Sequence, residues 1–461
     1  MNDIMNTTNL FLIVGAALLL APPAAIMAQS AWQTVPDFQC ASLSAVEAFA
    51  KDAAGNLFAA DWTVDSRAGQ LAQVQKSTDQ GASWSVVEDF VYGTPRPSGS
   101  TEFLALGTDT AGGLYAVGYA TDERAQDHWI VRKSGVRGGV WSTVDDFVLP
   151  GGESSVAQGF AADTAGNLYV AGYARLAASG GSADLRKPCK HWLVRQSRDG
   201  GHTWSTIDDF KDDSGARARA ILSTPSGLFV AGSGWNGSPS GERWLVRKGT
   251  RGRAGGFRWQ TVDEFENQVH GFGNVSRAQG LGMDAQGNLY AVGLSCPFGS
   301  RRSSPQWVVR RAFPSGLDWA VVDTFQLGPE HFGAASGVAA SDQGGVLVVG
   351  EAVGDDNVVH WIVRQSATGK AGSWSVGDAT PAVAQKESEA AAEAFGEVTN
   401  LPDGTLRSTP PQCACGLTLL CDSTRVLAGG SSGAGPGHAL VRRLDLGPAT
   451  EIAATKLPAA H

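Results

Sequence analysis

Short stretches in which hydrophobic and polar residues alternate recur along the chain, and glycine-rich turns separate them. The runs "LYVAGY" at 168–173 and "HWLVRQS" at 191–197 are typical. Alternation with a period of two predicts β-strands, because successive side chains of a strand point to opposite faces of a sheet. Turns of Gly, Asn and Asp between such runs predict hairpins. The pattern therefore predicts an all-β protein built from many short strands.

Three signatures recur in a fixed order, and each marks one part of a repeated unit. A tryptophan opens W-x-x-V/I-D/E-x-F-like segments at Trp32, Trp84, Trp141, Trp204, Trp259, Trp319 and Trp374. The stretch D-x-x-G-N-L-Y-x-x-G begins at Asp52, Asp109, Asp163 and Asp284. Degenerate copies begin at Ser223, Asp342 and Cys421. The stretch H-W-x-V-R begins at His128, His191, Arg243, Gln306, His360 and His438, and "AQVQKS" from Ala72 stands in its place in the first unit.

Each unit predicts four strands, and four-stranded units repeated radially make a β-propeller. The tryptophan signature starts one unit early, at Trp32, whereas the other two signatures finish at His438. Residues 32–38 would therefore supply the fourth strand of the last unit and leave no exposed edge. We predict a seven-bladed β-propeller of four-stranded blades, with its ring closed by this N-terminal strand.

Two stretches also carry a family resemblance. The pattern S-x-D-x-G-x-x-W at 77–84 and 197–204 is similar to the Asp-box (BNR) repeat of sialidase-like propellers, and the D-x-x-G-N-x-Y stretches resemble repeats of bacterial exported β-propellers. The resemblance covers about residues 32–445. The box Asp can accept backbone N–H bonds and the box Gly can take a positive φ, which predicts a hairpin staple. The residues with this predicted structural role are Ser77, Asp79, Gly81, Trp84, Ser197, Asp199, Gly201 and Trp204.

The ends of the chain predict export. Residues 10–20 form the apolar run "LFLIVGAALLL", and small residues follow Pro22 and Pro23. This pattern predicts a signal peptide over 1–28, although no Lys or Arg precedes the run. The propeller would then span 29–445, with a long insertion at 380–416, and a flexible tail would follow at 446–461. We expect a secreted or periplasmic protein.

Composition narrows the classes of partner and cofactor. The net charge of −9 and pI of about 5.4 argue against nucleic acid and anionic membranes as partners. The six cysteines lack paired C-x₂₋₄-C spacing, and no phosphate-binding glycine motif is present, so we expect no metal and no cofactor. A disulfide of Cys40 with Cys413 or Cys415 is predicted, because the first and last blades adjoin. We expect a monomer that binds a glycan or a protein.

Most of the residues that resemble catalytic groups recur in the repeat, which favours a scaffold role. His128, His191 and His360 open the third strand, while Asp145, Asp208 and Asp378 close the fourth strand. Antiparallel pairing predicts His–Asp contacts between them, and Arg243 opposite Asp263 predicts a matching ion pair. A catalytic pair is not usually copied around a ring, so cross-strand pairing is the better interpretation. The recurring arginine of the H-W-x-V-R stretch is likewise interpreted as part of the scaffold.

Residues outside the repeat provide two candidate functions. Trp62, Tyr119 and Tyr173 end the second strand of the first three units, and Trp235 also lies outside the repeated positions. Flat aromatic faces suit sugar rings, so these four residues predict a binding site on the top-face loops. The alternative is a sialidase-like glycoside hydrolase, for which Arg96, Glu102, Tyr92, Arg217 and Arg277 are the candidate catalytic residues. No catalytic set is convincing, and binding or scaffolding is the preferred function.

Overall fold

The computed structural model describes only part of the chain. The chain divides into two units, Met1–Ser30 and Ala31–His461, and every described residue belongs to the second unit. The described residues are 33–34, 45–135, 139–176, 190–212, 215–235, 241–253, 255–266, 274–297, 304–328, 331–340, 345–355, 359–381, 399–400, 406–407, 418–421, 425–432 and 438–445. The predicted signal peptide, the Cys40 disulfide, the C-terminal tail and most of the 380–416 insertion lie outside these residues.

The all-β prediction is confirmed, because the described residues form strands and no helix. Successive strands pair antiparallel in sets of four. The sets are β2 (Val46–Lys51), β3 (Leu57–Asp65), β4 (Gly69–Ser77) and β5 (Ser85–Phe90); β6 (Thr101–Thr108), β7 (Leu114–Thr121), β8 (Asp127–Ser134) and β9 (Trp141–Phe147); β10 (Gly152–Ala162), β11 (Leu168–Leu176), β12 (Lys190–Ser197) and β13 (Ser205–Phe210); β14 (Ala216–Thr224), β15 (Gly227–Trp235), β16 (Gly241–Arg251) and β17 (Phe257–Phe265); β18 (Asn274–Met283), β19 (Leu289–Pro297), β20 (Gln306–Ala312) and β21 (Ala320–Phe325); and β22 (Gly333–Ala340), β23 (Val346–Val353), β24 (Val359–Ser366) and β25 (Trp374–Pro381).

The last set combines the two ends of the unit. β28 (Thr418–Cys421), β29 (Arg425–Ser432) and β30 (His438–Asp445) pair in order, and β1 (Gln33–Thr34) pairs with β30. Short parallel contacts join β8 to β10 and β16 to β18. Within the insertion, β26 (Thr399–Asn400) and β27 (Leu406–Arg407) form a separate two-stranded sheet.

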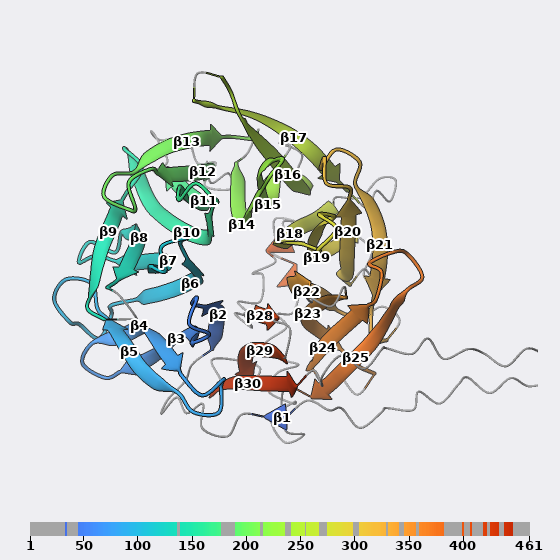
Figure 1. Ribbon diagram of the computed structural model, residues 1–461, viewed down its shortest axis with the longest axis horizontal. Helices are drawn as coiled ribbons and strands as arrows, with labels where there is room; N and C mark the ends of the chain where they lie inside the picture. Colours follow the sequence, from blue (N-terminus) through green and yellow to red (C-terminus); the bar gives the residue numbers. More distant parts are fainter. Residues whose placement is uncertain are drawn as a thin grey trace, which may run out of the picture. The chain divides into compact units, whose positions relative to one another are not determined.

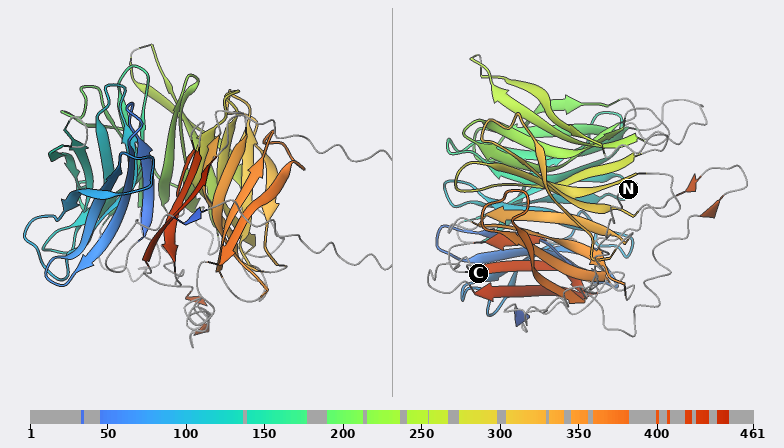
Figure 2. Two further views of the ribbon diagram at one scale, coloured as in Figure 1. Left: turned by 60° about the horizontal axis from the view of Figure 1, so that its bottom comes forward. Right: turned by 90° about the vertical axis from the view of Figure 1, so that its right-hand side faces the viewer.

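The first strand of each set lies nearest the centre of the arrangement (Figure 1). These innermost strands contact one another in the order β2, β6, β10, β14, β18, β22 and β28, and β28 also contacts β2. Figure 2 shows neighbouring sheets packed side by side with their strands running in similar directions. Side chains on the innermost strands are therefore brought together from positions more than forty residues apart in the sequence.

The recurring Asp of the first hairpin explains the D-x-x-G-N-L-Y signature. The Oδ1 atom of Asp163 accepts hydrogen bonds from the backbone N–H groups of Ala165 (3.0 Å) and Asn167 (2.9 Å). Its Oδ2 atom accepts from the Asn167 amide (2.7 Å) and the Tyr169 hydroxyl (2.9 Å). Asp284 makes the same four contacts. The signature therefore encodes a closed turn, because its recurring Asp, Asn and Tyr form hydrogen bonds with one another.

The two S-x-D-x-G-x-x-W hairpins share one hydrogen-bond pattern. Ser197 Oγ donates to Asp199 Oδ1 (2.8 Å) and accepts from the Gly201 N–H (2.8 Å), and Trp204 Nε1 donates to the Gly201 carbonyl (3.1 Å). Ser77, Asp79, Gly81 and Trp84 repeat these contacts. Gly81 and Gly201 have φ values of +88° and +94°, which a residue with a Cβ rarely adopts. These bonds hold each hairpin. Hydrogen bonds from the Ser83 hydroxyl and backbone N–H, followed by the bond from Ser77, lower the pKa of the Asp79 carboxyl to about 2.

Hydrophobic residues fill the space between neighbouring sheets. Trp129 of β8 is fully buried with its ring edge against Phe147 of β9 (centroids 6.4 Å apart), and it packs toward Leu168 and Val170 of the next sheet. Trp192, Trp244 and Trp307 repeat this arrangement with Phe210, Phe265 and Phe325. The tryptophan of H-W-x-V-R and the phenylalanine of the W-x-x-V-D-x-F segment therefore form one inter-sheet core unit.

The predicted partners of the histidines were wrong by one residue. His128 Nδ1 lies 2.7 Å from Asp146 Oδ1, not beside Asp145, and His191 Nδ1 lies 2.6 Å from Asp209 Oδ1, not beside Asp208. Arg243 likewise pairs with Glu264 and with Asp212, not with Asp263. The side chain of Asp378, the predicted partner of His360, lies outside the described residues. Neighbouring residues of a strand face opposite sides, so a displacement of one residue directs the carboxylate to the other sheet face.

The displaced aspartates bind the next sheet instead. Asp145 accepts two hydrogen bonds from Arg195, at 2.7 and 2.8 Å, and the Arg195 guanidinium lies 3.9 Å from the Phe147 ring centroid. The two hydrogen bonds recur in the pairs Asp208–Arg247, Asp263–Arg310 and Asp323–Arg364. At a further sheet boundary, Arg132 forms a single hydrogen bond to Glu88. The arginine of the H-W-x-V-R stretch, for which the sequence predicts a scaffold role, therefore joins neighbouring sheets.

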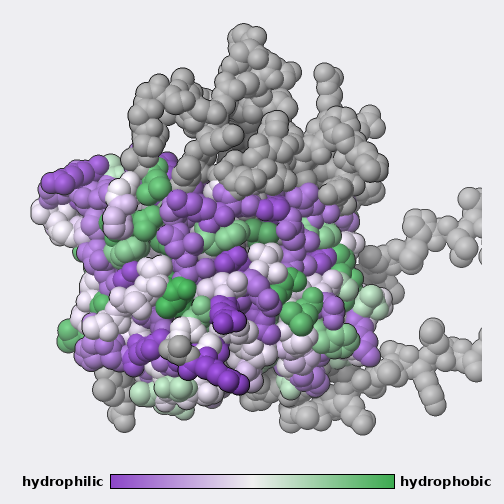
Figure 3. Space-filling view, turned by 90° about the horizontal axis from the view of Figure 1, so that it is seen from above, coloured by the Kyte–Doolittle hydropathy of each residue, from purple (hydrophilic) through white to green (hydrophobic). Residues whose placement is uncertain are grey.

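The outer surface is mixed in polarity. On the face shown in Figure 3, hydrophobic residues are scattered among hydrophilic ones. The large hydrophobic residues with the greatest exposure in the described part are Val140, Phe313 and Leu317. No helix that is both long and apolar enough to cross a membrane occurs among the described residues.

Candidate functional site

A β-bulge interrupts the innermost strand of six sheets at equivalent positions. In β14 the register shifts between Ala218 and Ala220, so Arg219 is the extra residue. The corresponding extra residues of the other sheets are Glu47, Leu104, Gln158, Gln279 and Ser336. A bulge re-aims one side chain and leaves it outside the regular ladder. The repeat therefore presents one side chain per sheet at the same level of the innermost strands, and its chemistry differs from sheet to sheet.

Three arginines gather on two adjacent innermost strands, and we call them the arginine cluster. Arg217 and Arg219 lie on β14, and Arg277 lies on β18 at the position that corresponds to Arg217. Burial first, and then the positive charges of Arg277 and Arg217, lower the pKa of Arg219 to about 10. Burial likewise lowers the pKa of Arg217. Like charges that are close enough to lower one another's pKa destabilise the site unless an anion is bound there.

The cluster carries more positive charge than its neighbours neutralise. Glu242 of β16 accepts a hydrogen bond from Arg277 Nε at 2.5 Å and is almost fully buried. The charge of Glu242 also acts on Arg217 and Arg219, but their Nε atoms are buried and have no hydrogen-bond partner within the part of the chain that the structure describes. A partly buried cation with an unpartnered N–H group is costly, so natural proteins seldom keep one without a ligand or a functional reason. The cluster therefore has the properties of an anion-binding site.

Two of the predicted aromatic residues adjoin the cluster. The Arg217 guanidinium lies 5.1 Å from the Tyr173 ring centroid and 5.5 Å from the Trp235 ring centroid. Both aromatic side chains are partly exposed. A guanidinium between two aromatic faces gains cation–π stabilisation without using its N–H donors. The donors stay available for an anionic ligand, and the aromatic faces stay available for apolar contact with it.

The other two predicted aromatic residues contact carboxylates. Glu47 of β2 and Glu102 of β6 lie close enough for the charge of Glu102 to raise the pKa of Glu47, and we call them the acidic pair. The Tyr119 hydroxyl donates to Glu102 Oε2 at 2.9 Å, and the Trp62 side chain donates to Glu47. Trp62 is only 8 % exposed, so it packs beneath the surface instead of forming an open shelf.

Glu47→Gln is expected to stabilise the protein at neutral pH. Burial is the largest cause that raises the pKa of Glu47, so the folded state binds its proton more tightly than the unfolded state does. Glu47 therefore makes its full contribution to the free energy of unfolding below the ordinary Glu pKa. This contribution is lost as the pH rises through the raised pKa of the folded state. The variant should therefore melt a few degrees higher than the parent at pH 7 and at the same temperature at pH 4.

Calorimetric melting at both pH values tests this expectation. Glu123→Gln is the matched control, because Glu123 is exposed and should leave the melting temperature unchanged at either pH. An equal or lower melting temperature for Glu47→Gln at pH 7 would contradict the burial of an uncompensated carboxylate.

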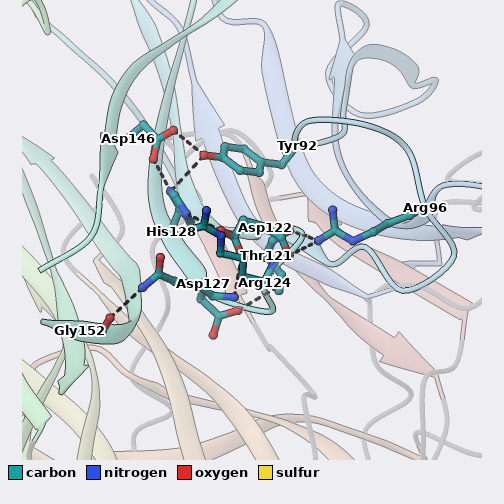
Figure 4. A network of polar contacts seen from close by, with 10 residues as sticks. Tyr92, Arg96, Thr121, Asp122, Arg124, Asp127, His128, Asp146 and Gly152 are labelled. Carbon is teal, nitrogen blue, oxygen red and sulfur yellow. Dashed lines mark hydrogen bonds and ion pairs between the residues drawn. The ribbon is translucent and has the colours of Figure 1, made fainter. Parts of the chain in front are cut away.

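The remaining candidate catalytic residues lie in a separate network (Figure 4). The Tyr92 hydroxyl donates to Asp146 Oδ2 at 2.8 Å and lies 3.1 Å from His128 Nδ1. Arg96 Nη2 donates to the backbone carbonyl of Thr121 at 2.5 Å and to that of Asp122. Burial and the neighbouring carboxylates raise the pKa of the Tyr92 phenol, so the group is a hydrogen-bond donor at neutral pH. Both side chains therefore join the loop after β5 to the second sheet.

The structure thus divides the five candidate catalytic residues among three places. Arg217 and Arg277 lie in the arginine cluster, Glu102 lies in the acidic pair, and Tyr92 and Arg96 lie in the network of Figure 4. Sequence reasoning missed Arg219, Glu47 and Glu242. A signal for Arg219 was present in "ARARAILS" at 216–223, where charged residues alternate with alanine in a strand that should face other strands. No group of three or more His, Cys, Asp or Glu residues in the described ranges is arranged to hold a metal ion.

No protein-family model and no curated protein matches this sequence. Among solved structures, a Hadza microbial sialidase is 13 % identical over 67 % of this chain, with a TM-score of 0.43, and this chain spans 63 % of the length of that structure. A GH93 α-L-arabinofuranosidase of Fusarium graminearum in complex with arabinobiose is 12 % identical over 89 % of this chain and 96 % of its own, with a TM-score of 0.46. An ulvan lyase of family PL25 is 10 % identical over 88 % and 95 %, with a TM-score of 0.46. Such distant likeness transfers no activity to this chain.

Proposed function

We propose that this protein binds an acidic glycan at the arginine cluster. The single observation that carries the proposal is the presence of two partly buried guanidinium groups, Arg217 and Arg219, whose buried Nε atoms have no hydrogen-bond partner among the described residues. Planar guanidinium groups match the geometry of carboxylate and sulfate oxygens. Tyr173 and Trp235 flank the cluster with aromatic faces that suit the apolar side of a sugar ring.

We also infer that the unit is a seven-bladed propeller closed by its N-terminal strand. Three observations support this inference: the sets of four strands, the pairing of Gln33 with Arg443 and Thr34 with Arg442, and the cyclic order of contacts among the innermost strands. The apolar run at 10–20 supports export to the periplasm or the medium, where glycans are available. The Asp-box resemblance of the two S-x-D-x-G-x-x-W hairpins belongs to the same proposal.

A glycan array tests the proposed function. Carboxylated glycans should bind, and their neutral counterparts should bind at least tenfold more weakly. Arg219→Gln should weaken binding by at least about tenfold, since hydrogen bonds to a charged group contribute ~1.5–3 kcal/mol. Without ligand, the same variant should melt at a higher temperature, because it removes a positive charge that partial burial and two neighbouring arginines disfavour.

Arg253→Gln is the control for the charge change, because Arg253 is exposed and lies in the β16–β17 hairpin. Equal binding of neutral and carboxylated glycans, or full binding by Arg219→Gln, would refute the proposal. Absence of binding to every glycan would leave the protein-scaffold alternative in its place.

A glycoside hydrolase is the second candidate, and the acidic pair is the observation that favours it. Glycosidases use two carboxyl groups, one of which is held protonated by a raised pKa. Burial raises the pKa of both Glu47 and Glu102. Burial also raises the pKa of Tyr119, which makes this phenol unsuitable as an ionised nucleophile. Release of reducing ends from the glycans bound in the array experiment would identify hydrolysis, and its absence would leave binding as the function.

A further inference from the structure

A pair of cations lies near the arginine cluster, on the neighbouring sheet. Arg175 of β11 and Lys190 of β12 are directly paired across the two strands. The Lys190 ammonium lies 5.6 Å from the Tyr173 ring centroid, and the charge of Arg175 lowers the pKa of Arg217. The Tyr173 ring therefore has a cation near it from a strand of each of two sheets, Arg217 of β14 at 5.1 Å and Lys190 of β12 at 5.6 Å, and Arg175 is the strand partner of Lys190.

The outer pair is only partly neutralised. Arg175 Nε lies 3.2 Å from Glu153 Oε2, and both side chains are about half exposed, so solvent screens this ion pair. Lys190 is only 9 % exposed, and its contact among the described residues is with the Tyr173 ring. Two positive groups that both adjoin one aromatic ring match a ligand whose negative charges recur along its length.

We propose that the ligand is an acidic polysaccharide chain and not a single acidic sugar. The arginine cluster binds the carboxylate of one sugar residue, Tyr173 stacks against the ring between, and Arg175 with Lys190 binds the carboxylate of another residue. This inference rests on the proposed function and adds the requirement for a chain. A nucleic acid also carries recurring negative charges. Its binding usually needs a broad basic surface, whereas this protein has two small groups of cations and a net charge of −9, which favours the saccharide.

Isothermal titration with two oligomer series tests the inference. The probes are galacturonic acid and mannuronic acid, each as monomer, dimer, tetramer and hexamer. The parent protein should bind the tetramer at least about tenfold more tightly than the monomer, because the second contact is intramolecular. Lys190→Gln and Arg175→Gln should each reduce this gain to about twofold or less, while the affinity for the monomer stays within about twofold of the parent value.

The controls separate the chain requirement from the proposed function itself. Lys211→Gln removes a charge from an exposed residue of the same region and should keep the full gain with length. Arg175 is half exposed, so its variant remains informative even if Lys190→Gln disturbs folding, which the melting temperature of each variant reports. Equal affinity for monomer and tetramer, or an unchanged gain in both variants, overturns the chain inference alone. Failure of every acidic saccharide to bind overturns the proposed function as well. Tighter binding of a single-stranded oligonucleotide of equal charge overturns the saccharide assignment.

Discussion

Replacing Arg195 by alanine is expected to lower the free energy of unfolding by about 3–5 kcal/mol. Arg195 and Asp145 are each less than a tenth exposed and form two parallel hydrogen bonds across a sheet boundary. Burial already raises the pKa of Asp145, and the guanidinium is the group that offsets this effect. Its removal leaves a buried carboxylate without a counter-charge and also removes the stacking on Phe147. The loss should therefore far exceed that of a surface ion pair.

Denaturant unfolding measures this effect, and two further variants interpret it. Arg258→Ala, on the exposed side of β17, should change stability by less than about 0.5 kcal/mol. Arg195→Lys keeps the charge but loses the bidentate geometry, so its loss should be intermediate. In the double variant Asp145→Ala/Arg195→Ala the two losses should not add, because each single change breaks the same contact. Equal small losses for Arg195→Ala and Arg258→Ala would show that the inter-sheet pair does not stabilise the fold.

Gly172→Ala is the second change with a large expected effect on stability, at about 1–3 kcal/mol or more. A Cβ atom at this position would lie 2.0 Å from the Val156 carbonyl oxygen and 2.7 Å from the Trp129 ring. The first neighbour is backbone in the same sheet, and the second is a fully buried ring of the preceding sheet, so neither can move away easily. Gly232, Gly293 and Gly350 have the same surroundings with Trp192, Trp244 and Trp307.

Thermal melting tests the role of this glycine. Gly256→Ala is the control, because a Cβ there meets nothing within 4 Å, and its effect should stay within about 0.5 kcal/mol. A neutral result for Gly172→Ala would mean that the sheets can separate enough to accept a methyl group. The first sheet supports the packing argument. Asp61 stands there at the position of Gly172, and the last H-W-x-V-R stretch has Ala439 in place of its tryptophan.

The candidate site was only partly predictable. Arg217, Arg277, Tyr173 and Trp235 were all named from the sequence, but for two different functions, and the structure brings them together around one cluster. Arg219 was missed because a β-bulge changes its direction, and a bulge has no reliable signature in a short run of alternating residues. Tyr92 and Glu102 were named in one candidate catalytic set, but Tyr92 donates to Asp146, because the loop after β5 reaches across to the second sheet.

The sequence by itself determined the strands, the hairpins and the sets of four. These features depend on residues close together in the chain: alternation sets the strand faces, and Asp163 with Asn167 and Tyr169 closes a turn within seven residues. Only the tertiary structure decided which sheet each side chain meets. Asp145 and Asp146 are adjacent in the sequence, yet one binds Arg195, fifty residues away, and the other binds His128 in its own sheet. The physical reason is that a shift of one residue reverses the face of a strand, and contacts between sheets are fixed by that face rather than by any local preference.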